Sequence, residues 1–315
     1  MLSPQKFSRA SAIAGIVVWE LGFFWRSSTL IETELINKIL LLAVLVIVPL
    51  GLNVAATDQD EASSFSFRLA AFAQPFGAAA VFVSFLLKQG IVAALLASAW
   101  LIVAALISLH GLSRLRARRA RVLAEISVSA GLVYLSVGSG WLVMSRLGIQ
   151  LLGFGDTIVL LTAVHFHYAG FAAPILCGVA GRVLAQHAIG VERLFVLAVL
   201  GVIAGTPLVA AGITFSPLLG LAGTLIISTA LLLLGVLVIG WVVPRVSGPW
   251  VQLLLVISSI SPFISMTLAS IYAYSIVANK LIIDIPQMAL AHGIINALGF
   301  SLCGLVAWTL FRSEK

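Results

Sequence analysis

Two histidines and a tyrosine interrupt a long apolar stretch near the middle of the chain. They are His165, His167 and Tyr168, in the sequence LTAVHFHYAGF at positions 161–171. Ionisable side chains are costly at membrane depth, so they usually face the interior of a helix bundle and mark a pathway for ions, protons or substrates. Histidine can also gain or lose a proton near neutral pH. The stretch therefore predicts a proton or substrate site.

A second polar stretch, HGIINALGF, occupies positions 292–300 near the C-terminal end. His292 and Asn296 are four residues apart, so a helix would place both on one face within hydrogen-bonding reach of each other. At a rise of ~1.5 Å per residue, His292 would lie within roughly 5–8 Å of the depth of His165 and His167. We therefore expect that one site draws on both helices.

The two neighbouring histidines cannot point in the same direction from a regular helix. At ~100° per residue, His165 and His167 are about 200° apart. His165 then shares a face with Tyr168, and His167 shares a face with Asp156, at the outer end of the helix. We expect Asp156, together with Glu20 near the outer end of the first helix, to lie near the outer mouth of the site.

Three functions are compatible with these residues. The first is a transporter or permease-like protein in which His167 and His292 relay a proton. The second is a membrane enzyme or a protein that binds haem or a transition metal through His165 or His167 and His292, since haem needs only one histidine from each side. The third is an assembly partner without chemistry, whose polar residues only pack helices together. The transporter is preferred. We predict no catalytic residues and, outside the second function, no cofactor.

The composition identifies the class of protein. Of 315 residues, 61% are hydrophobic and 9% are charged, against roughly 25% charged in soluble domains. We predict an all-α, multi-pass protein of the cell membrane, surrounded by the lipid bilayer and acting on a small molecule or an ion. The net charge of +7 does not indicate nucleic-acid binding, because the basic residues lie in short breaks between apolar runs. The cysteines Cys177 and Cys303 form no metal or disulfide motif.

Apolar runs divide the chain into about ten transmembrane helices within a single membrane domain covering residues 1–315. The N-terminal run resembles a signal peptide but is expected to be a retained helix, because Glu20 interrupts it and no cleavage site follows. The predicted helices are 10–25, 36–54, 67–87, 91–110, 122–144, 157–180, 194–215, 218–243, 249–278 and 286–311.

The lysines and arginines predict the orientation of these helices. With both termini inside, thirteen of the 18 basic residues fall in inner segments. The remaining five, expected in outer segments, are Arg26, Lys38, Lys88, Arg146 and Lys280. Because inner loops carry an excess of positive charge, the arrangement favours both termini inside.

The two polar stretches resemble the YndJ-like family of bacterial integral membrane proteins. The resemblance lies in LTAVHFHYAGF and HGIINALGF and implies a multi-pass membrane protein, sometimes described as a transporter. Some relatives are longer at the C-terminus, so an activity in such an extension is not expected here. The family positions fall on His165, His167, Tyr168, Gly170, Phe171, His292, Asn296 and Gly299.

Overall fold

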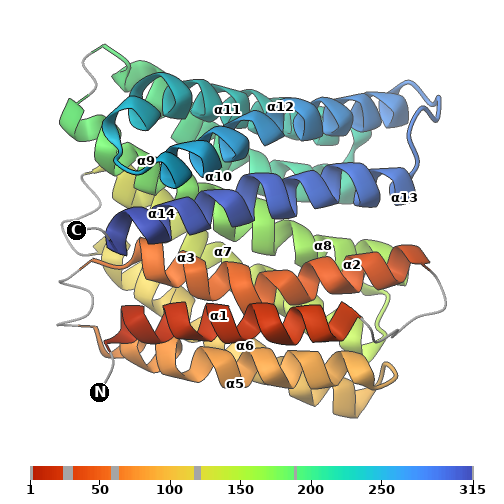
Figure 1. Cartoon of the computed structure of the whole chain (residues 1–315). Helices are drawn as coiled ribbons and strands as arrows, with labels where there is room; N and C mark the ends of the chain where they lie inside the picture. Colours follow the sequence, from red (N-terminus) through yellow and green to blue (C-terminus); the bar gives the residue numbers. More distant parts are fainter. Residues whose placement is uncertain (1–2, 24–30, 58–63, 117–121, 188–189, 314–315) are drawn as a thin grey trace. The chain divides into compact units, whose positions relative to one another are not determined.

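The computed structural model describes residues 3–23, 31–57, 64–116, 122–187 and 190–313. Within these residues the protein is helical and has no β-strand, which confirms the predicted all-α class. The helices form two compact units (Figure 1). Unit 1 comprises residues 1–119 and 129–172, and unit 2 comprises residues 120–128 and 173–315.

The helices lie close to their predicted positions. Nine helical segments in the described residues are long and apolar enough to cross a membrane. In unit 1 the helices are α1 (Pro4–Phe23), α2 (Ile31–Leu42), the π-helix η1 (Ala43–Ile47), α3 (Val48–Ala55), α5 (Phe65–Leu86), α6 (Ile91–Arg116), α8 (Asp156–His165) and the π-helix η4 (Phe166–Ala172), with α7 (Leu123–Leu147) shared between the units. In unit 2 they are α9 (Ala173–His187), α10 (Glu192–Phe215), α11 (Pro217–Leu237), the π-helix η5 (Val238–Val242), α12 (Pro249–Val277), α13 (Ile285–Gln287), the π-helices η7 (Met288–Gly293) and η8 (Ile295–Leu302), and α14 (Cys303–Ser313). Short 3₁₀ turns, η3 (Leu151–Gly153) and η6 (Val243–Arg245), complete the chain.

Helix α1 corresponds to the first predicted span. It has 20 residues but carries three charged ones, Lys6, Arg9 and Glu20, which lowers its hydropathy below that of the other spans. Its outward face is nevertheless mostly apolar: Ile13, Val17 and Leu21 are all more than half exposed, and the charged Glu20 lies only one turn before the helix end. An apolar outward stripe is what a lipid-facing helix presents. We therefore treat α1 as the tenth spanning helix.

The core of unit 1 is the continuous helix formed by α2, η1 and α3. In the most apolar window of its span, Thr33–Ala55, 89% of the residues are buried. Helices α1, α5 and α8 pack beside α2 (Figure 1). The π-helix precedes Pro49, where Val48 N–H already bonds the carbonyl five residues back. In that register Pro49, which has no N–H, leaves the carbonyl of Val44 without its helical partner. The side chain of Gln74 on α5 donates to this carbonyl at 3.0 Å.

Helix α1 packs closely against the same π-helical segment at a glycine. The position of a Cβ at Gly15 is taken by the carbonyl oxygen of Leu45. Ser11, one turn earlier, donates to Oε1 of Gln74 at 2.6 Å. These contacts join α1, α5 and η1 at one level. Side chains from two neighbouring helices therefore satisfy or support the carbonyl group that Pro49 leaves without a helical partner.

Unit 2 is assembled through small residues. The hairpin of α10 and α11 closes where Gly212 lies directly against Gly220, and Cβ atoms at Gly205 and Gly223 would come within 2.7 Å of the opposite helix. Helix α12 packs against α11 and against the segment from η7 to α14. Close approach at small residues is the usual way that membrane helices associate.

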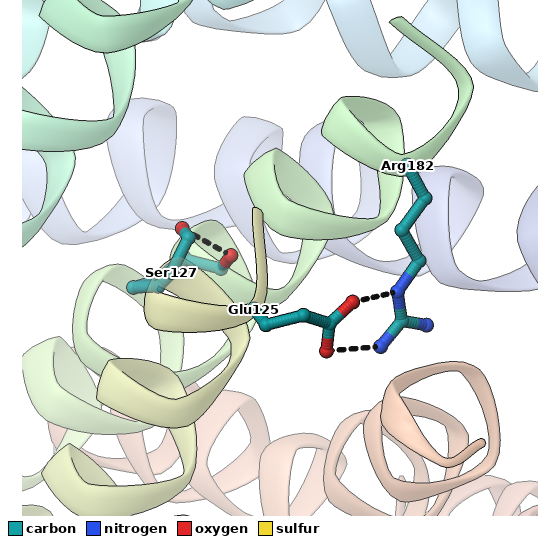
Figure 2. A network of polar contacts seen from close by, with 4 residues as sticks. Glu125, Ser127 and Arg182 are labelled. Atoms are coloured by element: carbon teal, nitrogen blue, oxygen red, sulfur yellow. Dashed lines mark hydrogen bonds and ion pairs between the residues drawn. The ribbon is translucent and has the colours of Figure 1, made fainter. Parts of the chain in front are cut away.

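An ion pair and a hydroxyl group join the start of α7 to α9, as Figure 2 shows. Arg182 donates from Nε and Nη2 to the two carboxylate oxygens of Glu125, at 2.7 and 3.1 Å. Ser127 donates to the carbonyl of Pro174 at 2.7 Å, and Gly178 allows the two helices to touch. Arg121, four residues before Glu125 in the sequence, lies outside the described residues.

The second helix, predicted from residue 36, begins at Ile31. It therefore includes Glu34, which is only 8% exposed. Lys38, counted with the outer segments, lies within the helix. Arg146, also expected in an outer segment, is 7% exposed and donates to the carbonyls of Ser84 and Leu87. The charges of Glu34, Lys38 and Arg146 predicted contact with solvent, but packing against other helices buries most of their side chains.

Candidate functional site

Both polar stretches found in the sequence adopt π-helical backbone. The first lies at the end of α8 and in η4, and the second lies in η7 and η8. A π-helix inserts extra residues per turn and is frequent at functional sites. It also leaves carbonyl groups outside the regular pattern, which polar side chains can then bind. The unusual backbone and the unusual side chains therefore coincide.

His167 is fully buried in unit 1, with both ring nitrogens bonded. The indole Nε1 of Trp100 lies 3.0 Å from Nε2, and Nδ1 lies 2.8 Å from the carbonyl oxygen of Ala163. An indole can only donate and a carbonyl can only accept. This arrangement therefore requires a neutral imidazole with its proton on Nδ1, and a second proton on Nε2 would break the bond to Trp100.

The surroundings of His167 are closely packed. The ring stacks on Trp100 with 6.2 Å between centroids and 17° between planes. A Cβ at Gly138 on α7 would lie 2.8 Å from Nδ1, so only glycine fits there without displacement. The sequence analysis did not identify Trp100 or Gly138. The signal that could have identified Trp100 is its position as a lone tryptophan in the middle of an apolar helix.

Tyr168 is also a packing residue. Its hydroxyl donates at 2.9 Å to the carbonyl of Ile39 in α2, and the side chain is 7% exposed. His165, at the end of α8, is half-buried and lies edge-on to Phe166. The predicted divergence of the two histidines agrees with their different burial.

The two acidic residues expected near the outer mouth are exposed. Asp156 is the first residue of α8, where a carboxylate is favourable at the helix N-terminus. Glu20 lies on the outward side of α1, one turn before its end. Both positions are compatible with the predicted mouth, and their link to a site stays a prediction.

His292 and Asn296 form a hydrogen-bonded cluster with Ser265 of α12 in unit 2. Nδ1 of His292 lies 2.8 Å from the carbonyl oxygen of Ser265. The Ser265 hydroxyl donates to Oδ1 of Asn296 at 3.0 Å, and Nδ2 of Asn296 donates to the His292 carbonyl at 3.0 Å. The predicted proximity of His292 and Asn296 is therefore observed, and Ser265 is a third member that the sequence did not suggest.

Nε2 of His292 differs from Nε2 of His167. Because Nδ1 carries the proton that is donated to Ser265, Nε2 holds a lone pair. Its contact with Nδ2 of Asn296, at 3.3 Å, is long for a hydrogen bond. His292 and Asn296 are half-buried, and with only this long contact Nε2 is the ring nitrogen of His292 at which a proton would bind.

On one side of this cluster, toward the C-terminal end of the last span, small residues hold α12 against that span. The Ser258 hydroxyl donates to the carbonyl of Phe300 at 2.7 Å. Ser261 lies directly against Gly299, and Ser258 lies against Gly304. Gly299, a family position, thus allows the close approach that places His292 and Asn296 against Ser265.

The structure groups the predicted residues into two sets. His165, His167 and Tyr168 belong to unit 1, and His292 and Asn296 belong to unit 2. A single site formed by both sets stays a prediction. Within the described residues no three His, Cys, Asp or Glu side chains are grouped as a metal site. The lone pair of His167 already accepts from Trp100, so His167 in this arrangement has no free nitrogen for a haem or a metal.

Comparison with known proteins agrees with the resemblance seen in the sequence. A model of the YndJ-like protein family matches residues 38–300, a range that includes both polar stretches. The chain belongs to the YndJ-like family. It is 32% identical over 204 residues to the uncharacterized membrane protein YndJ of Bacillus subtilis (strain 168). The match covers 64% of this chain and 36% of that protein. No solved structure matches.

Proposed function

We propose that this protein is a permease-like transporter of the cell membrane that moves protons, alone or together with a small polar solute. The observation that supports this function is the cluster of Ser265, His292 and Asn296. It places a histidine with an available Nε2 lone pair inside an apolar span, on π-helical backbone. Intramembrane histidines of this kind are typical of proton relays.

The geometry provides a response to protonation. A proton on Nε2 of His292 would face the NH₂ group of Asn296, so the amide must turn and present its oxygen. That rotation removes the acceptor of the Ser265 hydroxyl, now bonded at 3.0 Å. Protonation at one atom would therefore rearrange three side chains on two helices, which is a means of coupling a proton to a change in helix packing.

The other predicted residues have different roles in this proposal. His165, Asp156 and Glu20 would provide titratable groups toward the outer side. His167 and Tyr168 would support the bundle, because their hydrogen bonds to Trp100, Ala163 and Ile39 leave no capacity for relay. The relay would then rest on His292 rather than on His167.

The test measures proton flux in liposomes that contain the purified protein and a trapped pH-sensitive dye, with a potassium diffusion potential as the driving force. The wild type should acidify or alkalinise the lumen faster than protein-free liposomes. His292→Gln should reduce the rate to the protein-free level. His110→Gln is the matched control, because His110 belongs to unit 1, lies against Ser64 and Phe67, and is not a member of this cluster. Equal rates for His292→Gln and His110→Gln would reject the proposal.

A further inference from the structure

An ion pair lies buried near the start of the central helix of unit 1. Nζ of Lys38 is 3.5 Å from Oε1 of Glu34, and the two side chains are only 15% and 10% exposed. Asn37, between them, is 6% exposed. The three residues share one side of α2, and the predicted second helix, 36–54, includes Asn37 and Lys38 but not Glu34.

Two hydrogen bonds fix the depth of this ion pair. Trp19 of α1 donates to the carbonyl of Lys38 at 2.7 Å, and Tyr168 donates to the carbonyl of Ile39 at 2.9 Å. Helices α2 and α8 run in the same direction (Figure 1). Tyr168 follows Asp156 by about 18 Å along its helix, and Glu34 precedes Ile39 by about 7.5 Å. Glu34 therefore lies deeper than Asp156, the first residue of α8.

Within the part of the chain that the structure describes, the elements packed around α2 contribute few other ionisable groups. Helix α1 carries Glu20 next to Trp19, and α8 carries Asp156 and His165. Tyr168 comes from η4, while η1 and the outer half of α5, residues 76–86, have no charged residue. His165 precedes Tyr168 by about one turn, so it is the titratable side chain of α8 nearest to the level of Glu34.

Packing alone does not account for this ion pair. An exposed pair with this spacing stabilises a helix by about 0.3–0.5 kcal/mol. Removal of each ion from water costs several kcal/mol. Two apolar residues would satisfy the same buried helix face at lower cost, so the charges are better explained by a function that needs them.

We propose that Glu34 is a proton-binding site, with Lys38 as its counter-ion in the unprotonated state. A proton bound at the carboxylate forms an O–H bond, neutralises Glu34 and breaks the ion pair, so that the site gains one positive charge. The inference rests on the proposed function, because it identifies a group in unit 1 that binds the transported or coupled proton. Asp156, at the start of α8, lies nearer the outer end than Glu34, and His165 lies close to the level of Glu34.

Infrared difference spectroscopy of the purified protein tests the site without any transport assay. The C=O band of a protonated, buried carboxyl group is followed from about pH 4 to about pH 9, a range that includes the ordinary values of carboxyl groups and histidine. The wild type should show one such titrating band. Glu34→Gln should lose it, and Lys38→Met should shift its midpoint. Glu20→Gln, which removes an exposed carboxylate from α1, should leave the band unchanged.

The outcomes separate this inference from the proposed function. Each variant is first checked for a single peak in size-exclusion chromatography. If Glu34→Gln does not fold, Glu34→Asp replaces it and should move the band rather than remove it. Identical titrations of the wild type and the Glu34 variant would overturn the site, whatever the liposome flux. Loss of the band in Glu34→Gln would support the site, even if the His292 test rejects transport through unit 2.

Discussion

Gly138 controls the packing of His167 at the scale of single residues. A methyl group at this position would lie 2.8 Å from Nδ1 of His167 and 2.9 Å from Cβ of Phe166. We expect Gly138→Ala to lower the free energy of unfolding by about 1–3 kcal/mol, the usual cost of overpacking. The measurement is the thermal midpoint of the detergent-purified protein.

Gly140, two residues later on the same helix, is the matched control. A Cβ there would meet no atom within 4 Å. Gly140→Ala should leave the midpoint unchanged or raise it, since alanine favours a helix by about 0.5–1 kcal/mol over glycine. If both variants were equally stable, His167 would not be held as tightly as its contacts indicate.

A second prediction concerns the element formed by η1 and Pro49. If Gln74 satisfies the carbonyl that Pro49 leaves without a partner, Gln74→Ala should destabilise the protein by about 1–3 kcal/mol. In a Pro49→Ala background the main-chain N–H is restored, so the same Gln74 substitution should cost less. Chemical or thermal unfolding of the four proteins measures this coupling. Equal costs in both backgrounds would mean that Gln74 acts only through its contact with Ser11.

The contact of α7 with α9 gives a third prediction at the scale of elements. The bidentate pair of Glu125 and Arg182 is partly buried, with side-chain exposures of 16% and 24%. A double-mutant cycle with Glu125→Gln and Arg182→Met should give a coupling energy of about 0.5–3 kcal/mol. Arg182→Lys should retain only part of it, because an ammonium cannot make both bonds in the same plane. A coupling near zero would show that the helices are held by Ser127 and Gly178 instead.

The sequence predicted the elements better than it predicted their polar contacts. Apolar runs locate the helices because a fixed bilayer thickness demands a fixed length. The spacing of His292 and Asn296 also predicted their contact, since a helix determines it locally. Ser265, Trp100 and Gly138 come from distant parts of the chain, and no local pattern connects them to the histidines. The burial of Glu34 and Lys38 was not predicted, because it depends on α1 and α8 and not on their neighbours in the sequence.

The orientation of the whole molecule gives the last prediction. The excess of basic residues predicts both termini inside, which places the α5–α6 turn outside and the α11–α12 connection inside. In a variant with Cys177 and Cys303 replaced by alanine, a cysteine at Gln89 should react with a membrane-impermeant thiol reagent in intact cells. A cysteine at Ser247 should react only after the membrane is opened. The reverse pattern would mean that both termini lie outside. Asp156 and Glu20 would then lie near an inner rather than an outer mouth.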